Sequence, residues 1–317
     1  MLLVVLEHDR GEIAEASYEA LTAGRALAAA LGVALHAASL GADLSAASAN
    51  YGAVTTHVVT HDLLADYGPE AWGEALAQLV EATGATVVLA TGTDRGNEVL
   101  AQLAARRDLP FAANCSEMTP GDPWRVVRAR WGGSLLEEAT VAAPVHVLSV
   151  THHATEAAPS PVDGAVATFV PALDASLGRS VVRDRVVRTA GVTLGTARVV
   201  VGGGRGVGSP EGFGVLEELA GLLGGVVGCS RAVTNAGWRN HTDQVGQTGT
   251  RIAPDIYIAC GISGAIQHWV GAMASKRILA INTDKDANMV AKADYAVIGD
   301  LHQVVPAIAA EIERRRA

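Results

Sequence analysis

The chain has 317 residues, of which 49% are hydrophobic and 4% aromatic, and its formal net charge is −9. This length suffices for two domains, and the acidic balance argues against nucleic acid or an anionic membrane surface as the main partner. No apolar run approaches the roughly 20 residues of a membrane-spanning helix, so we expect a protein that is not membrane-embedded.

The first half of the chain alternates short apolar runs with amphipathic stretches. This βαβ rhythm predicts an open, mainly parallel sheet. Two alternating runs flank Gly132 and Gly133 and predict an added hairpin. The predicted strands are LLVVLEH, VALHAASL, HVVTH, TVVLATG and PVHVLSV, and the predicted helices are 17–31, 70–83 and 96–107.

Residues 151–168 have no period and are predicted to be a connector, and residues 181–189 an extended segment that leads away from the first domain. A second series of strand–loop–helix units begins near Arg188, with helices expected at 211–223, 265–274 and 301–316. The sequence therefore predicts an α/β fold: two doubly wound domains with mainly parallel sheets, residues 1–187 and 188–317, the N-terminal one with an added hairpin.

The three cysteines, Cys115, Cys229 and Cys260, belong to no CxxC pair. Their odd number and their spacing predict neither a disulfide framework nor a zinc site. His152 and His153 are adjacent, but no carboxylate or cysteine stands at ligand spacing beside them, so we expect no metal. A reducing, cytoplasmic location is the simplest interpretation.

In the second domain, the loops after the strands are polar or glycine-rich, and ligands of such folds bind at the carboxyl ends of strands. In GISGAIQH, Gly261 and Gly264 permit close backbone approach, and Ser263 can cap the following helix. The free N–H groups at the start of that helix favour an anion, above all a phosphate. An ordinary glycine turn is the alternative, because GxxG is less specific than GxGxxG.

That helix is expected to bury Ala265, Ile266, Trp269, Val270 and Met273, which leaves His268 free to face the crevice.

Two arginines follow strands, Arg205 in GGGRGVGS and Arg231 after Ser230. Arg205 either reaches a phosphate or a ring, or is a solvated residue of a flexible turn. Arg231 could stabilise an anionic ligand or the anionic state of a ring. The aperiodic stretch 242–250 is long enough to suggest binding, with Gln247 and Thr248 as donors to a heterocycle. Nearby, Arg239 and His241 either touch the ring edge or face water.

Taken together, the strings SRAVTNAGW, DQVGQTG, PDIYIACGISGAIQH, AINTDKDA and ADYAVIGDLHQVVP resemble the α-subunit of the electron transfer flavoproteins, the FixB family. The match is specific over the second domain and looser over the first. Thr250 and Thr283 depart from the residues usual there, at positions outside the implied flavin site.

The resemblance implies an FAD-binding subunit that forms a heterodimer with a β-subunit, against which the N-terminal domain packs. It implies an electron carrier without substrate turnover, which accepts electrons from dehydrogenases and passes them to another redox protein. The implied cofactor contacts are Arg205, Ser230, Arg231, Gln244, Val245, Gly246, Gln247, Thr248, Gly261, Ser263, Gly264, Ala265, Ile266, Gln267, His268, Asn282, Asp300 and Leu301.

Within this set the resemblance implies separate roles. Ser263 and Gly264 would hold the diphosphate, and Asn282 and Asp300 would contact the adenosine end. The flavin would be tuned by three residues: Arg231 over the ring, Thr248 at the central-ring nitrogen and His268 near the pyrimidine carbonyl.

From the residues alone, two other classes of protein remain as alternatives. A nicotinamide-dinucleotide-dependent oxidoreductase would share the double-wound domain, but the sequence lacks GxGxxG and an acid–base pair near the loops. A cofactor-free scaffold would not need the phosphate and ring loops that the second domain carries.

Overall fold

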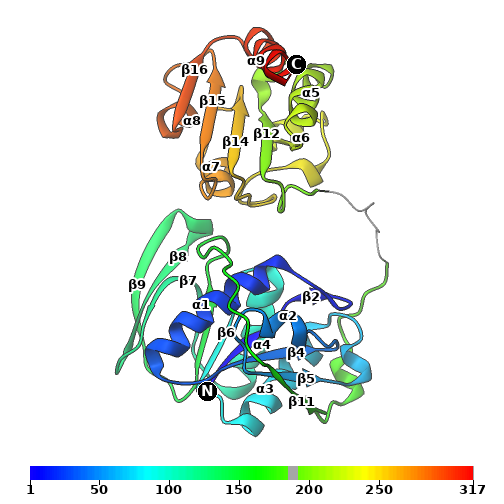
Figure 1. Ribbon diagram of the computed structural model, residues 1–317, viewed down its shortest axis with the longest axis vertical. Helices are drawn as coiled ribbons and strands as arrows, with labels where there is room; N and C mark the ends of the chain where they lie inside the picture. Colours follow the sequence, from blue (N-terminus) through cyan, green and yellow to red (C-terminus); the bar gives the residue numbers. More distant parts are fainter. Residues whose placement is uncertain (185–191, 317) are drawn as a thin grey trace. The chain divides into compact units, whose positions relative to one another are not determined.

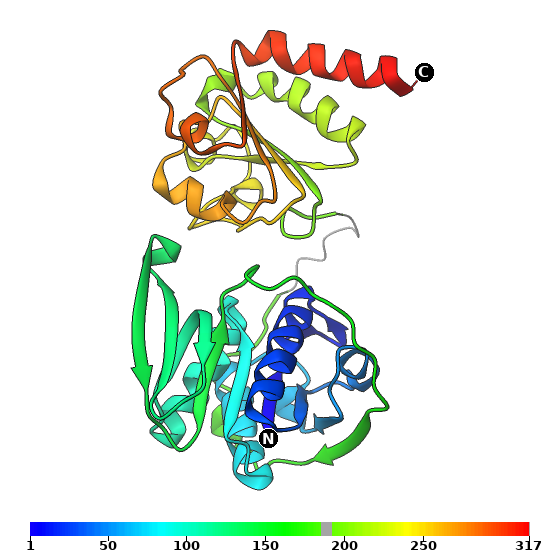
Figure 2. The same cartoon turned by 60° about the vertical axis from the view of Figure 1, so that its left-hand side comes forward.

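The computed structural model describes residues 1–184 and 192–316, and the chain divides into two compact units, Met1–Val187 and Arg188–Ala317. Each unit is built on one main sheet with helices on both faces (Figures 1 and 2). The boundary expected between residues 187 and 188, and part of the extended segment expected at 181–189, lie outside the described residues.

The N-terminal unit contains a nine-stranded sheet in the order β11-β5-β4-β1-β6-β10-β7-β8-β9. The strands from β11 to β7 are parallel, and β8 and β9 form the predicted antiparallel hairpin. The strands are β1 (Leu2–Val5), β4 (Leu35–Leu40), β5 (Thr55–Val59), β6 (Val87–Thr91), β7 (Phe111–Thr119), β8 (Trp124–Arg130), β9 (Leu135–Val141), β10 (His146–Val150) and β11 (Ala165–Phe169), with a separate two-stranded hairpin, β2 (His8–Asp9) and β3 (Glu12–Ile13).

Helices cover both faces of this sheet because apolar side chains point to both sides of its buried parallel strands. One core cluster packs α3 and α4 against the sheet, and a second packs α1 and the base of the hairpin against the other face. The helices are α1 (Glu15–Leu31), α2 (Ser45–Ala49), α3 (Pro69–Thr83) and α4 (Asp94–Arg107). The three predicted helices are confirmed, each starting one or two residues earlier than expected.

The prediction that residues 151–168 are only a connector is wrong. The segment runs along α1, where Thr22 Oγ1 accepts the N–H of Ala158 and Arg25 donates to the Ala158 carbonyl. It then forms β11, which pairs in parallel with β5 at the sheet edge. The apolar alternation of β11 is too short and too close to prolines to stand out in the sequence.

The C-terminal unit contains a five-stranded, wholly parallel sheet in the order β13-β12-β14-β15-β16. One core cluster packs α5 and α9 on one face, where Figure 2 shows them side by side, and another packs the opposite face around Tyr257 and Met289. The elements are β12 (Val199–Gly203), α5 (Gly214–Leu222), β13 (Val226–Cys229), α6 (Arg231–Asn235), β14 (Ile256–Cys260), α7 (Ile266–Ala272), β15 (Ile278–Asn282), α8 (Asn288–Lys292), β16 (Tyr295–Ile298) and α9 (Leu301–Arg316).

The predicted α/β class, with two doubly wound sheets and an added hairpin, is therefore confirmed. The helix at 301–316 is confirmed to the residue. The helix expected at 211–223 is divided into two elements: a 3₁₀ turn, Glu211–Phe213, and α5, which follows it. Among the described residues, no helix is long and apolar enough to cross a membrane.

The packing of β12 yields a testable prediction. A Cβ added at Gly203 would lie 2.7 Å from Cζ of the Phe213 ring, so Gly203→Ala should lower the free energy of unfolding by about 1–3 kcal/mol through overpacking. Urea denaturation followed by circular dichroism measures this.

Gly221→Ala is the matched control, because nothing lies within 4 Å of an added Cβ at that position in α5. It should be neutral or stabilise by up to about 1 kcal/mol, since alanine has the higher helix propensity. Equal effects of the two substitutions would contradict the close packing of β12.

Candidate functional site

A cavity of about 760 Å³ opens at the carboxyl edge of the second sheet. β13 and β14 lie on opposite sides of β12, so the connections after β12 and β14 diverge and leave a crevice, as expected at a topological switch point. Loops that follow four strands line it: Gly204, Arg205 and Gly206 after β12; Ser230, Arg231, Ala232 and Asn235 after β13; Gly261, Ile262, Ser263, Gly264, Ala265, Gln267 and His268 after β14; and Asn282, Asp284 and Ala287 after β15.

The floor of the cavity is a contact between two backbones. The N–H of Gly204 donates to the carbonyl of Cys260 at 2.9 Å, and the N–H of Gly206 donates to that of Gly261 at 3.1 Å. A Cβ at Gly206 would lie 2.7 Å from the Gly261 Cα, so side chains are excluded here. Gly261 also has a φ of 60°, a left-handed conformation that favours glycine.

A turn with free main-chain donors forms one wall. Gly264 has a φ of 75° and packs against Met289, where a Cβ would lie 2.7 Å from Cα. Among residues 1–184 and 192–316, no group accepts the N–H of Gly264, Ala265 or Ile266. Three free donors beside an open cavity suit an anionic ligand.

Ser263 does not cap the helix, contrary to expectation. The N-terminal capping position of α7 is Ala265, without a side-chain hydrogen bond, and the Ser263 carbonyl accepts the N–H of Met289 at 3.2 Å. Ser263 is instead exposed and lines the cavity. The backbone of the turn, held by Met289, therefore shapes the wall.

Two cationic side chains converge on the cavity from different strands. Arg205 begins a short 3₁₀ turn after β12, and Arg231 is the first residue of α6 after β13. Within the part of the chain that the structure describes, neither guanidinium forms an ion pair or hydrogen bond with another side chain. Asp284 is the carboxylate in the lining, and its Oδ1 accepts the N–H of Asp286. The balance of charge favours a ligand that carries negative charge.

His268 lies at the inner wall, on α7. Its Nε2 is 2.8 Å from the hydroxyl of Tyr257, a fully buried residue of β14. Burial raises the pKa of Tyr257 well above its ordinary value, so the phenol stays protonated. Its O–H group donates the hydrogen bond to His268 Nε2. This assignment, from the hydrogen-bond network, puts the imidazole proton on Nδ1.

The imidazole of His268 is neutral at physiological pH. Burial lowers its pKa to about 4, opposed by the weaker effect of the Val245 backbone. No described residue forms a hydrogen bond of good geometry with the buried Nδ1. His268 thus adds a neutral imidazole to the wall of the cavity, in contrast to the two arginines.

The stretch that contains Gln244, Val245, Gly246, Gln247 and Thr248 does not line the cavity. Gln244 is buried: its Oε1 accepts from Thr234 and its Nε2 donates to Thr248 Oγ1 at 3.0 Å. The Gln247 N–H donates to the Gln267 carbonyl at 2.7 Å. This stretch therefore supports α7 from behind.

The expected buried face of α7 is only partly confirmed. Val270 is buried and Trp269 packs on the core, as expected, but Ile266 and Met273 are exposed by 52% and 48%. His268, Gly271 and Ala272 are buried instead. Gly271 is buried because the 244–250 stretch packs on it, and a Cβ there would lie 2.8 Å from the Gly246 carbonyl carbon. The helix turns its small residues inward since its partner is a backbone segment.

The remaining expected residues fall into two groups. Asn282 lines the cavity and joins two loops, because its Nδ2 donates to the Ile262 carbonyl and its Oδ1 accepts the N–H of Asp284. Asp300 and Leu301 follow β16 and are not part of the lining: Asp300 caps α9 by accepting the N–H of His302, and Leu301 is in the core.

Arg239 neither faces water nor lines the cavity. Its guanidinium pairs with Glu217 and with Asp243, and it lies over the Phe213 ring. It therefore fixes the base of the 242–250 stretch to α5. His241, in contrast, is exposed.

Sequence reasoning missed Asn235 and Asp284 in the lining, and Tyr257 behind His268. A signal existed for Tyr257, because a tyrosine inside an apolar strand needs a partner for its hydroxyl. Asn235 could not be found because α6, which places it one turn after Arg231, was not predicted.

Comparison with known proteins agrees with this geometry. Residues 193–273 match the family model of the electron transfer flavoprotein FAD-binding domain, and residues 2–177 match that of the electron transfer flavoprotein domain. The chain is 38% identical to the electron transfer flavoprotein subunit alpha of Mycobacterium tuberculosis over 99% of both chains. It is 35% identical to that of Thermoanaerobacterium thermosaccharolyticum over 98% of this chain and 97% of the relative. It is 33% identical to protein FixB of Azorhizobium caulinodans over 96% of this chain and 86% of the relative.

The neutral state of His268 predicts a pH dependence of stability. Its pKa rises from about 4 in the folded chain to an ordinary 6.5 on unfolding, so between these values only the unfolded chain binds the proton, and stability is lost as the pH falls. From about pH 7 to about pH 5, the wild type should lose about 1–2 kcal/mol more than His268→Gln.

Urea denaturation of both proteins at the two pH values measures this difference. Other histidines titrate equally in both proteins and cancel. An identical pH dependence would contradict burial of a neutral imidazole.

Proposed function

Because this chain belongs to the electron transfer flavoprotein α-subunit family and carries that family's FAD-binding domain, we propose that the flavin dinucleotide occupies the cavity at the carboxyl edge of the second sheet. One observation carries this proposal: main-chain donors and two arginines that follow separate strands, none of which has a side-chain or main-chain partner for these groups among the described residues, meet at a single cavity. The match to an FAD-binding domain gives no support to the nicotinamide-dependent alternative.

The turn after β14 is the proposed seat of the diphosphate. The free N–H groups of Gly264, Ala265 and Ile266 can donate to its oxygens, and the Ser263 hydroxyl can add a further donor. Arg205, on the neighbouring loop, supplies the compensating positive charge. Because Gly264 is held against Met289, these donors keep their direction before the ligand arrives.

The opposite part of the site would surround the flavin ring. Bound FAD supplies a ring that accepts electrons and gains negative charge. Arg231 would place a cation beside that charge, and His268 a neutral imidazole. Thr248 lies outside the lining of the cavity, so it would donate its hydroxyl proton to a part of the ring that extends past the lining. Its oxygen already accepts from Gln244 Nε2.

Other expected contacts would act from the edge of the site. Asn282, with Asp300 and Leu301 beyond the lining, would meet the adenosine end. Val245, Gly246, Gln247, Ser230, Gly261 and Gln267 would contribute main-chain contacts or shape.

We further propose a heterodimer with a β-subunit that binds on the N-terminal unit. The added hairpin exposes apolar side chains, Trp131 by 79%, Leu135 by 57% and Leu136 by 72%, which is typical of a docking surface. The dimer would carry electrons from dehydrogenases to a redox-protein acceptor in the cytoplasm, without substrate turnover. The three buried free cysteines fit a reducing compartment.

The cofactor content tests the proposed function. The chain, purified with its partner subunit and without added cofactor, should release FAD on acid denaturation, as identified by chromatography. A preparation that carries a nicotinamide dinucleotide, or that stays colourless after incubation with FAD, would overturn the proposal.

Arg231→Ala should lower the reduction potential of the bound flavin, because a cation beside developing negative charge is lost. We expect the potential to fall by roughly 20–45 mV, which corresponds to a loss of about 1–2 kcal/mol for a two-electron couple. Spectroelectrochemical titration measures this shift.

Arg198→Ala is the matched control. Arg198 precedes β12 at the opposite, amino edge of the same sheet and pairs with Asp255 at 2.6 Å. Its removal should leave the potential unchanged. Equal shifts in the two variants, or none in Arg231→Ala, would remove Arg231 from its assigned role.

A further inference from the structure

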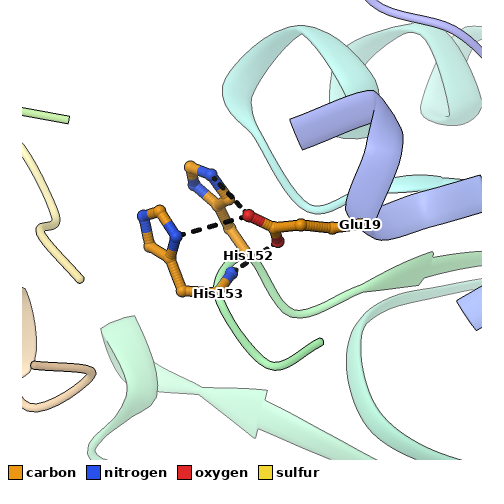
Figure 3. A group of neighbouring side chains, drawn as sticks. All are labelled: Glu19, His152 and His153. Atoms are coloured by element: carbon orange, nitrogen blue, oxygen red, sulfur yellow. Dashed lines mark hydrogen bonds and ion pairs between the residues drawn. The ribbon is translucent and has the colours of Figure 1, made fainter. Parts of the chain in front are cut away.

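Glu19, His152 and His153 form a compact cluster in the N-terminal unit (Figure 3). Glu19 lies on α1, and the two histidines follow β10. The expected absence of a metal site rested on spacing along the sequence, where no carboxylate stands near the histidines. The fold brings in a carboxylate from 134 positions away.

The spacing of the three side chains suits ligands around a common ion. Glu19 Oε1 lies 3.6 Å from His152 Nε2 and 3.4 Å from His153 Nδ1, and the three ligand atoms lie within 4.8 Å of one another. A charge-assisted hydrogen bond would be shorter, about 2.7–2.9 Å. Tetrahedral ligands at about 2.0–2.1 Å from a zinc ion are separated by about 3.3–3.4 Å.

The carboxylate of Glu19 is oriented before any ion arrives. Glu19 Oε2 accepts the main-chain N–H of His153 at 2.7 Å, which leaves Oε1 directed at both rings. The two imidazoles are stacked, with centroids 3.6 Å apart and planes inclined by 22°, so one ring must rotate for both nitrogens to face a common ion. The side chains of Glu19 and His153 are 12% exposed and that of His152 is 26% exposed, so solvent reaches the cluster at His152.

The second nitrogen of His153 is buried, and no described residue forms a hydrogen bond with Nε2. Nδ1 is therefore the nitrogen of this ring that faces the Glu19 carboxylate and is available to a cation.

We propose that Glu19 Oε1, His152 Nε2 and His153 Nδ1 bind one divalent cation of the Zn²⁺ type, with water completing its coordination. Two imidazole nitrogens and one carboxylate oxygen are ligands that zinc accepts. The ion joins α1 to the start of the segment that α1 also holds through Thr22 and Arg25. It thereby stabilises the N-terminal unit.

Isothermal titration with ZnCl₂ tests the proposal on the full chain, purified with its partner subunit, without a histidine tag and after chelator treatment. Glu19→Gln keeps an acceptor for the His153 N–H, and His153→Asn tolerates the φ of 65°. Each should weaken zinc binding at least about tenfold. Glu15→Gln, which removes an exposed carboxylate from the same helix, should bind as the wild type does.

The proposal is overturned if the wild type does not bind zinc. It is also overturned if Glu19→Gln and His153→Asn bind zinc as tightly as the wild type does. A crystal of the wild type soaked in ZnCl₂ gives a readout that needs no variant. The anomalous difference map should show a peak within bonding distance of the three named atoms, and a map with no peak there overturns the site.

Discussion

The candidate site depends on the contact between two backbones, those of the loops that follow β12 and β14. Neighbouring parallel strands bring these loops to the same edge, and Gly204, Gly206 and Gly261 let them meet through main-chain hydrogen bonds. A side chain at Gly206 or Gly261 would separate them. From this floor, the β14 loop continues through Gly264 into α7, so the free donors, His268 and the arginine of the β12 loop acquire fixed relative positions.

The electrostatics of the cavity follow from burial. Arg205 and Arg231 are exposed to water, whereas His268 is buried beside Tyr257, and burial lowers its pKa to about 4. The cavity therefore combines two cationic side chains with a neutral imidazole. This combination suits a ligand with a permanent anion and a ring that becomes negative. The 244–250 stretch, packed behind α7 on Gly271, holds this imidazole in place.

Features set by local sequence could be predicted, and those set by distant partners could not. The helix Leu301–Arg316 and the strands of the second sheet follow from their own periodicity. The strand-end rule correctly indicated the loops after β12, β13, β14 and β15, but not the loop after β16, which lies outside the lining. Part of the buried face of α7 was missed because its partner is an irregular segment that packs on Gly271. β11 was missed because its place depends on the free edge of β5. The juxtaposition of Glu19 with His153 has no signal in sequence spacing at all, since only the path of the chain after β10 creates it.

A crystal structure of the heterodimer with FAD locates the diphosphate relative to the turn after β14. We expect phosphate oxygens within hydrogen-bonding distance of the N–H groups of Gly264, Ala265 and Ile266, with the ring on the side of Arg231 and His268. A diphosphate bound elsewhere, or a flavin held outside the crevice between β12 and β14, would contradict this expectation.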